Sequence, residues 1–150
     1  MEDKKYAPAY AHNAIEELFE NVFWVHGSIQ MAPGMTMNRN MIILKQDGEL
    51  TLINPVRLNS QEEAKLCALG DITKVLRLGD FHGLDDQYYI DHFQAEFWCQ
   101  KGQSIYKAPI PDTIIEEETP SPIENSEFFI FSTAKFPEAA LLLKNHNLLI

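Results

Sequence analysis

Short apolar runs separated by polar turns dominate this chain, and their spacing predicts more strands than helices. Residues 46–48, Gln-Asp-Gly, favour a hairpin turn, because Asp-Gly supplies the left-handed backbone that a tight turn needs. Residues 12–19 carry a weak helical period and predict a short turn of helix, whereas residues 31–40 contain Pro-Gly, show little periodicity and predict a loop. The predicted strands, which are β-branched, aromatic or alternating, cover residues 22–29, 41–45, 49–53, 71–78, 95–99 and 128–131.

A capping-box pattern predicts the first full helix. Ser60 is followed three residues later by Glu63, so each side chain is expected to bond the other residue's backbone N–H. The helix should run to about Leu69 and end at Gly70, a left-handed C-cap. Its expected buried face consists of Ala64, Cys67 and Ala68. Because strands are predicted on both sides of this helix, the order indicates a βαβ-like unit.

The last third of the chain is less regular. Residues 107–123 are rich in proline and glutamate and predict a loop, with a short strand at residues 114–115. Residues 138–144 have a helix-forming composition, but the polar turn at residues 145–147 and the apolar end of the chain favour a β-hairpin.

Length and composition indicate one domain spanning residues 1–150, with residues 1–10 as a flexible arm. The formal charge of −10 argues against nucleic acid or an anionic membrane surface as a partner. No signal peptide is recognised and no apolar run approaches the ~18 residues of a membrane span, so a cytoplasmic location is predicted. Residues 148–150 end the chain in an apolar run, which predicts either a strand held in a sheet or the front part of a longer protein.

Candidate chemistry is concentrated in the loop that follows a predicted buried strand. Asp80, His82, Asp85 and Asp86 lie close together there, and such loops commonly build sites in α/β proteins. The alternative is an acidic turn in which Asp85 or Asp86 caps a second short helix that runs through about His92. A catalytic zinc ion needs about three protein ligands, of which this loop could supply two or three.

Other common catalytic patterns are absent from the sequence. Cys67 and Cys99 lack metal-finger spacing and indicate a reduced protein with two small core residues. His26 lies inside a predicted strand and is expected to be structural. The chain has neither a G-x-S-x-G elbow nor a Gly-rich phosphate loop, so no catalytic residue is assigned.

Several phrases of the sequence, in their order, resemble the metallo-β-lactamase superfamily. Residues 23–27 (FWVHG) resemble the strand before the family's hairpin, and residues 52–56 (LINPV) resemble its L-I-D-T-G phrase. Residues 69–75 (LGDITKV) are similar to the approach to its metal motif, T-H-x-H-x-D-H, and residues 132–139 (STAKFPEA) to its T-P-G-H-T-P-G-S segment. The resemblance covers about residues 22–150 and implies an α/β (α+β) fold, the αββα sandwich, of which this chain holds the first half and the start of the second.

At the metal ligands the sequence departs from the family pattern. Aligned without gaps, the motif's leading histidines fall on Asp80 and His82, and its later ligands fall on Leu84 and Asp85. A shift of two residues also leaves the ligand set incomplete. Lys135 stands where the later segment has a histidine, and an ammonium group has no lone pair for a metal. We expect Lys135 to pair with Asp80 or Asp85 and to replace the charge of the metal.

Three functions remain open from the sequence. The first is a divergent metallo-β-lactamase-fold protein without the dizinc hydrolase activity, which keeps a remnant acidic pocket around His82 for a small molecule or a partner; no cofactor is then expected. The second is a metal-dependent hydrolase whose carboxylate-rich site uses Asp80, His82 and Asp85 or Asp86 with zinc or another divalent metal ion. The third is a homo-oligomer, such as a homodimer, assembled through an unpaired strand edge.

Overall fold

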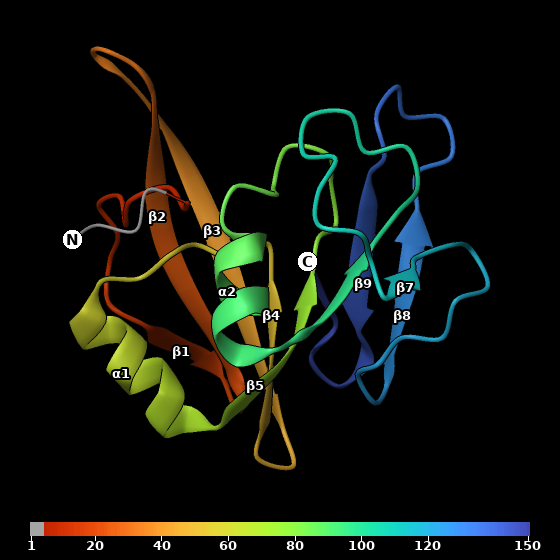
Figure 1. The fold of residues 1–150 in the computed structure, drawn as a ribbon. Coiled ribbons are helices and arrows are strands. Elements are labelled where there is room, and N and C mark those ends of the chain that lie inside the picture. The colour runs from red at the N-terminus through yellow and green to blue at the C-terminus, as the bar shows by residue number, and fades with distance from the viewer. Residues whose placement is uncertain (1–4) are drawn as a thin grey trace.

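The computed structural model describes residues 5–150, in which two sheets and two α-helices form layers (Figure 1). The larger sheet contains β1 (Glu16–Phe19), β2 (Val22–Ala32), β3 (Met35–Gln46), β4 (Glu49–Ile53), β5 (Asp71–Leu76), β6 (Glu96–Cys99) and β7 (Thr113–Ile114). The smaller sheet contains β8 (Ser126–Ile130), β9 (Ala139–Leu143) and β10 (Leu148–Leu149). The helices are α1 (Ser60–Leu69) and α2 (Asp86–Phe93), with one 3-10 turn, η1 (Lys144–His146).

The larger sheet keeps the order of the sequence from β1 to β7. Strands β1 to β4 pair antiparallel, and β4 to β7 pair parallel. Helix α1 makes the crossover between the parallel strands β4 and β5, which confirms the predicted βαβ unit. The smaller sheet has the order β10-β9-β8 and is wholly antiparallel.

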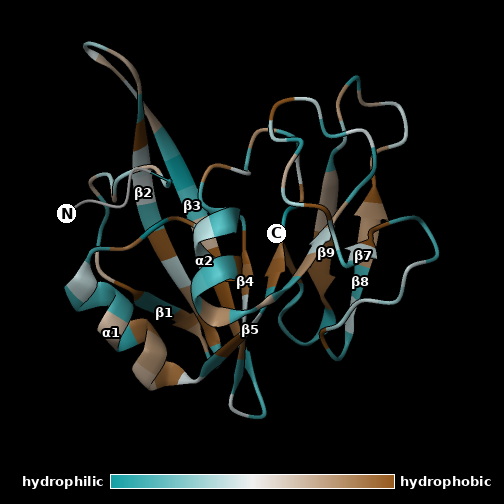
Figure 2. Ribbon diagram, viewed as in Figure 1, coloured by the Kyte–Doolittle hydropathy of each residue, from teal (hydrophilic) through white to brown (hydrophobic). Residues whose placement is uncertain are grey.

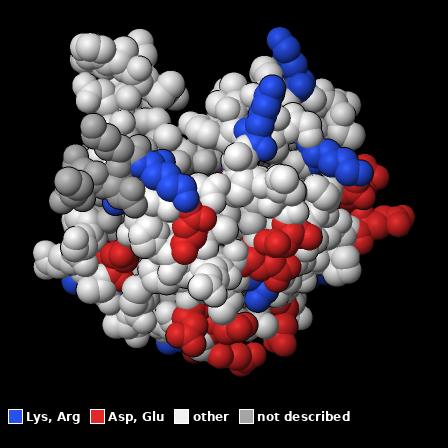
Figure 3. Space-filling view, in the orientation of Figure 1, with Lys and Arg blue, Asp and Glu red and all other residues white. Residues whose placement is uncertain are grey.

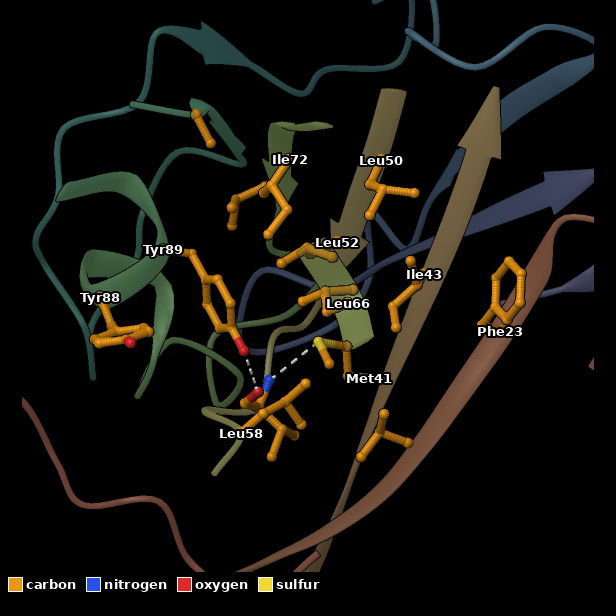
Figure 4. Close-up of a cluster of buried hydrophobic side chains, with 14 of the residues drawn as sticks. Phe23, Met41, Ile43, Leu50, Leu52, Leu58, Leu66, Ile72, Tyr88 and Tyr89 are labelled. Carbon is orange, nitrogen blue, oxygen red and sulfur yellow. Dashed lines mark hydrogen bonds between the residues drawn. The ribbon is translucent and has the colours of Figure 1, made fainter. Parts of the chain in front are cut away.

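Strand alternation divides the buried side chains between two cores. On β3, Met41 and Ile43 belong to the core beneath the helices, while Leu44 belongs to the core between the sheets. Figure 4 shows the first core, where the Tyr89 hydroxyl of α2 donates to the carbonyl of Val56 at 2.8 Å. Figure 2 shows apolar residues concentrated on the central strands, with a largely hydrophilic outer side on α2. The layers are therefore helices, larger sheet and smaller sheet, the first part of the expected αββα sandwich.

The β2–β3 hairpin extends well past the core and projects from the molecule (Figure 1). The loop predicted at residues 31–40 is therefore wrong, because Ala32 pairs with Met35 and only Pro33-Gly34 forms the turn. The backbone ladder holds this region while its methionines stay exposed. Without a buried face, the side chains carry no alternation that sequence reading could detect.

The helical turn predicted at residues 12–19 is also wrong. Residues Glu16–Phe19 form a strand, in which Glu16 lies opposite Trp24 and Phe19 opposite Val22. Asn21 makes the tight turn with a φ of 62°, which asparagine tolerates better than most residues. The unpaired edge of β2 supplied a ladder that outweighed the weak local preference for helix.

Helix α1 is shifted and rotated relative to the prediction. Its N-cap is Asn59, whose Oδ1 accepts the Glu62 N–H at 2.9 Å, so Ser60 is not the cap. The buried side chains are Glu62 and Leu66, whereas Ala64, Cys67 and Ala68 are exposed. The buried face of α1 was predicted from its apolar residues, and this failed because the charged residue Glu62 is buried. The Glu62 carboxylate accepts the Ile15 N–H at 3.0 Å and pairs with Lys65 at 2.5 Å.

Gly70 ends α1 in an extended conformation with a φ of 164°, not as the predicted left-handed cap. The residue is small for a different reason. A Cβ on Gly70 would lie 2.4 Å from the carbonyl oxygen of Gly48 in the β3–β4 turn. Close approach of two backbone segments therefore requires glycine here.

The rest of the chain follows the predicted elements closely. Helix α2 ends at Phe93, the short strand β7 is one residue earlier than expected, and β9 pairs with β10 as the predicted hairpin. Residues 1–4 of the predicted flexible arm lie outside the described residues, and Tyr6 beyond them donates its hydroxyl to Asp91 at 2.6 Å. No helix in the described part of the chain is long and apolar enough to cross a membrane.

The acidic composition is visible on the surface. On the face in Figure 3, Asp and Glu side chains gather over the lower half, and many of the Lys and Arg side chains lie nearer the upper rim. No continuous basic surface is seen on this face, as expected from the formal charge of −10.

Candidate functional site

The candidate loop leaves the carboxyl end of β5, the edge of parallel strands where α/β proteins place their sites. Asn54, just after β4, fixes the two strand ends together. Its backbone N–H donates to the carbonyl of Leu76, and its side-chain oxygen accepts the N–H of Leu78, both at 2.9 Å. The loop therefore starts from a rigid base.

Asp80 is fully buried and bonds a segment that follows β6. Its Oδ1 accepts the backbone N–H groups of Ser104 at 2.7 Å and Ile105 at 3.3 Å, and its Oδ2 accepts the Ser104 hydroxyl. Burial acts to raise the pKa of Asp80, but the hydrogen bonds from Ser104 and Ile105 outweigh it and leave the pKa below its ordinary value. Asp80 is thus an ionised anchor for a loop.

Asp85 is buried against two arginines. Its Oδ2 lies 2.8 Å from Nη1 of Arg39 on β3 and accepts the backbone N–H of Arg57 at 2.9 Å. Asp85 occupies the N-cap position of α2, as one of the two alternatives predicted, but its carboxylate makes no capping hydrogen bond. The side chain therefore joins the hairpin to the start of α2.

Asp86 and Arg77 form a pair in which both side chains are fully buried. The Arg77 Nε donates to Oδ2 of Asp86 at 2.6 Å, while its Nη atoms donate to the carbonyls of Tyr106 at 2.7 Å and Ala108 at 3.1 Å. Burial raises the pKa of Asp86 to about 6, although the Arg77 charge acts in the opposite direction. Arg77 was not predicted as a site residue, although an arginine inside the apolar run V-L-R-L is a signal that it needs a buried partner.

His82 is exposed and lines a cleft next to this loop. Partial desolvation, together with the charges of Arg39 and Arg77, lowers the pKa of His82 and so favours the neutral ring. Glu138 lies nearby, because a Cβ on Gly79 would be 2.8 Å from Glu138 Oε2 and 2.9 Å from His82 Cδ2. Glu138 was not predicted as a site residue either, and burial raises its pKa.

The predicted pairing of Lys135 with Asp80 or Asp85 is wrong. Lys135 is exposed, its ammonium lies 5.4 Å from the ring centroid of Phe136, and no ion pair to it is found within residues 5–150. Asp80 already has backbone and hydroxyl donors, and Asp85 already has Arg39. Oδ1 of Asp85 and Oδ1 of Asp86 are buried without a hydrogen-bond partner, but Lys135 forms an ion pair with neither within the described residues.

The cleft beside His82 has a volume of about 420 Å³ and lies between the β2–β3 hairpin, the loop after β5 and the segment after β6. Among residues 5–150 no carboxylate side chain lines it, so the expected acidic pocket is wrong: Asp80, Asp85 and Asp86 are turned into the protein. The polar lining comes from Arg39, His82, Tyr106 and three asparagines. The apolar lining comes from Ile29, Met31, Met37, Ile42, Ile53, Phe81, Leu84, Ile105 and Ile150.

The donor set does not fit a zinc centre. Within residues 5–150 no group of three or more His, Cys, Asp or Glu side chains is placed to hold a metal ion. The physical reason is that Asp80, Asp85 and Asp86 each direct an oxygen to a protein donor. His82 alone is left facing the cleft, and one imidazole is too few for a zinc site.

Comparison with known proteins identifies the fold. The chain superposes on VMB-1 with a TM-score of 0.72 and 12% identity, covering 90% of this chain and 67% of that chain. It superposes on a metallo-β-lactamase from Hirschia baltica with a TM-score of 0.68 and 12% identity, covering 91% and 70%. It also superposes on the metallo-β-lactamase IND-7 with a TM-score of 0.69 and 12% identity, covering 91% and 68%. The chain therefore has the metallo-β-lactamase fold.

No protein-family model and no curated protein sequence matches the chain. The match to solved structures covers roughly two thirds of those proteins, in agreement with a chain that holds the first part of the sandwich. At this level of identity the comparison defines the fold, and the site has to be interpreted from its own residues.

Proposed function

We propose that the protein binds a small, mostly apolar molecule in the cleft beside His82, on a metallo-β-lactamase fold that does not use a dizinc centre. The ligand would have an apolar body facing Met37, Leu84 and Ile105, and a hydrogen-bonding group facing Arg39 and His82. A cleft of several hundred Å³ with a few convergent polar groups suits such a molecule.

The observation that supports this proposal is the orientation of the acidic residues. Asp80, Asp85 and Asp86 are all buried and bonded inside the protein, whereas the surface that they leave open is apolar. A metal hydrolase needs the reverse arrangement, in which carboxylates and imidazoles face a water-filled space.

Two measurements on the 150-residue protein test the proposal. Titration with 1-anilinonaphthalene-8-sulfonate, an apolar molecule with one anionic group, should give saturable fluorescence at one site per chain. Leu84→Trp should abolish the signal by filling the cleft without changing the midpoint of thermal unfolding. A wild-type signal that is unaffected by Leu84→Trp would place the probe elsewhere and contradict the proposal.

Zinc binding is the second test. After incubation with zinc sulfate and desalting, elemental analysis should find zinc well below one ion per chain. Stoichiometric zinc that is lost in His82→Ala would favour the metal-dependent hydrolase instead.

A further inference from the structure

The segment after β6 is fastened to the end of β5 at two neighbouring points. Asp80 accepts three hydrogen bonds from Ser104 and Ile105. Arg77, three residues earlier, donates to the carbonyls of Tyr106 and Ala108. Between these points the side chains of Ile105 and Tyr106 line the cleft.

We propose that Asp80 is a positioning residue, which holds residues 103–108 in place as one wall of the cleft. The resemblance places the first metal ligand at this position, but here the carboxylate organises the site through backbone hydrogen bonds. This inference rests on the proposed ligand-binding role of the cleft and specifies which residue shapes it.

The segment has little else to hold it. Residues 103–108 belong to no strand or helix, and most of their side chains are exposed. A loop without a ladder or a buried apolar face depends on a few specific contacts for its order. Asp80 is fully buried and supplies an ionised acceptor, the stronger kind of hydrogen-bond partner.

The shape of the opposite wall agrees with a fixed position for this segment. A Cβ on Gly83 would lie 2.7 Å from Cζ of Arg77 and 2.7 Å from Cβ of Tyr106. The loop after β5 and the segment after β6 therefore fit against each other with no room for a side chain. Small movements of residues 103–108 would open this contact and widen the cleft.

Two substitutions of Asp80 distinguish a positioning role from a role that needs its negative charge. In Asp80→Asn the remaining oxygen can still accept the N–H groups of Ser104 and Ile105, and the new amide can donate to the Ser104 hydroxyl. In Asp80→Ala all three bonds are lost. A role that depends on the negative charge, as metal binding would, is not rescued by asparagine.

The readout that needs no ligand is amide hydrogen exchange on the 150-residue protein. Asp80→Ala should speed exchange at Ser104 and Ile105 by about tenfold or more, whereas Asp80→Asn should stay within about threefold of the wild type. The amide of Glu63, bonded to the carbonyl of Asn59 in α1, is the internal control and should not change. Unchanged exchange at Ser104 and Ile105 in Asp80→Ala would overturn the proposal.

Affinity for 1-anilinonaphthalene-8-sulfonate is the second readout. It should weaken about fivefold in Asp80→Ala and be largely restored in Asp80→Asn. Faster loop exchange with unchanged probe affinity would overturn the claim that the segment shapes the cleft. If the wild-type cleft binds no probe while exchange responds as expected, the proposed ligand function fails and the positioning role of Asp80 stands.

Ser104→Ala provides the test if Asp80→Ala does not fold. Ser104 is exposed and its hydroxyl is one of the three donors to Asp80, so its loss leaves the core intact. Exchange at Ile105 should rise by about threefold relative to the wild type. No change in exchange at Ile105 in this variant would reject the positioning role.

Discussion

The guanidinium of Arg77 and the carboxylate of Asp86 meet at 2.6 Å, and neither side chain has any exposed surface. Arg77 also bonds the carbonyls of the segment that lines the cleft. One buried pair therefore links the end of β5, the start of α2 and the wall of the cleft.

Removal of Arg77 is expected to be costly. Arg77→Met leaves the Asp86 carboxylate buried without a counter-charge, and breaking such a pair typically costs about 3–5 kcal/mol. Urea unfolding at pH 7 measures the loss. The control is Lys101→Met, which removes an exposed pair with Glu116 and should leave the urea midpoint almost unchanged. Equal effects of the two substitutions would show that burial does not determine the strength of the Arg77 pair.

Asp86 predicts a specific pH dependence. Its folded-state pKa is raised to about 6 from an ordinary 3.8, so the folded protein holds this proton more tightly than the unfolded chain. The stability that Asp86 contributes is therefore fully present below about pH 4 and declines as the pH rises to about 6. The cost of Asp86→Asn should be about 2–3 kcal/mol larger at pH 4 than at pH 8, as measured by urea unfolding. A cost that does not vary with pH would mean that the Asp86 pKa is not raised.

Two exposed methionines of the β2–β3 hairpin provide a test variant and its control for ligand binding in the cleft. Met37 lines the cleft and Met35 does not, although their exposed fractions are 53% and 57%. Met37→Ser should weaken the binding of 1-anilinonaphthalene-8-sulfonate about fivefold, because apolar contact area is lost. Met35→Ser should leave the affinity unchanged, and a similar loss in both variants would indicate nonspecific binding to the hairpin.

The N-cap of α1 can be tested by neighbouring substitutions. Asn59→Ala removes the acceptor for the Glu62 N–H and should lower the unfolding free energy by about 1 kcal/mol. Ser60→Ala should have a much smaller effect, since Ser60 is the first helical residue and not the cap. Thermal or urea unfolding distinguishes the two, and a larger loss in Ser60→Ala would support the capping box predicted from the sequence.

Gly70 should tolerate substitution less well than a turn glycine. Gly70→Ala places a Cβ 2.4 Å from the Gly48 carbonyl and is expected to cost about 2–3 kcal/mol, because backbone has to move. Gly34→Ala in the hairpin turn meets no atom within 4 Å and bears only the strain of a φ of 76°, about 1 kcal/mol. Urea unfolding of the two variants measures both costs, and a loss in Gly34→Ala as large as that in Gly70→Ala would contradict the prediction.

Elements were predictable from the sequence where side-chain periodicity reflects burial. The β3–β4 hairpin, the βαβ unit and the β9–β10 hairpin were all predicted, because each has one face in a core and a turn with its own signature. The long hairpin of β2 and β3 was missed because its outer part is held by backbone bonds alone. The buried face of α1 was predicted wrongly because the charged residue Glu62 is buried. Its carboxylate can lie there because it bonds the Ile15 N–H and the Lys65 ammonium.

The candidate site was also predictable only in those features that depend on local sequence. Local sequence located the region, because Asp80, His82, Asp85 and Asp86 all lie in the short stretch that follows β5. It could not determine which way each side chain faces. That depends on Arg39 and Ser104, which lie far away in the chain and reach these carboxylates only after the sheet has formed.

The sequence by itself determined the order of most elements after β3 and the position of the acidic loop, because turns and apolar runs are local properties. Only the tertiary structure decided that Asp80, Asp85 and Asp86 turn inward and that an apolar cleft remains beside His82. The physical reason is that a buried carboxylate needs donors, and those donors come from segments distant in the sequence.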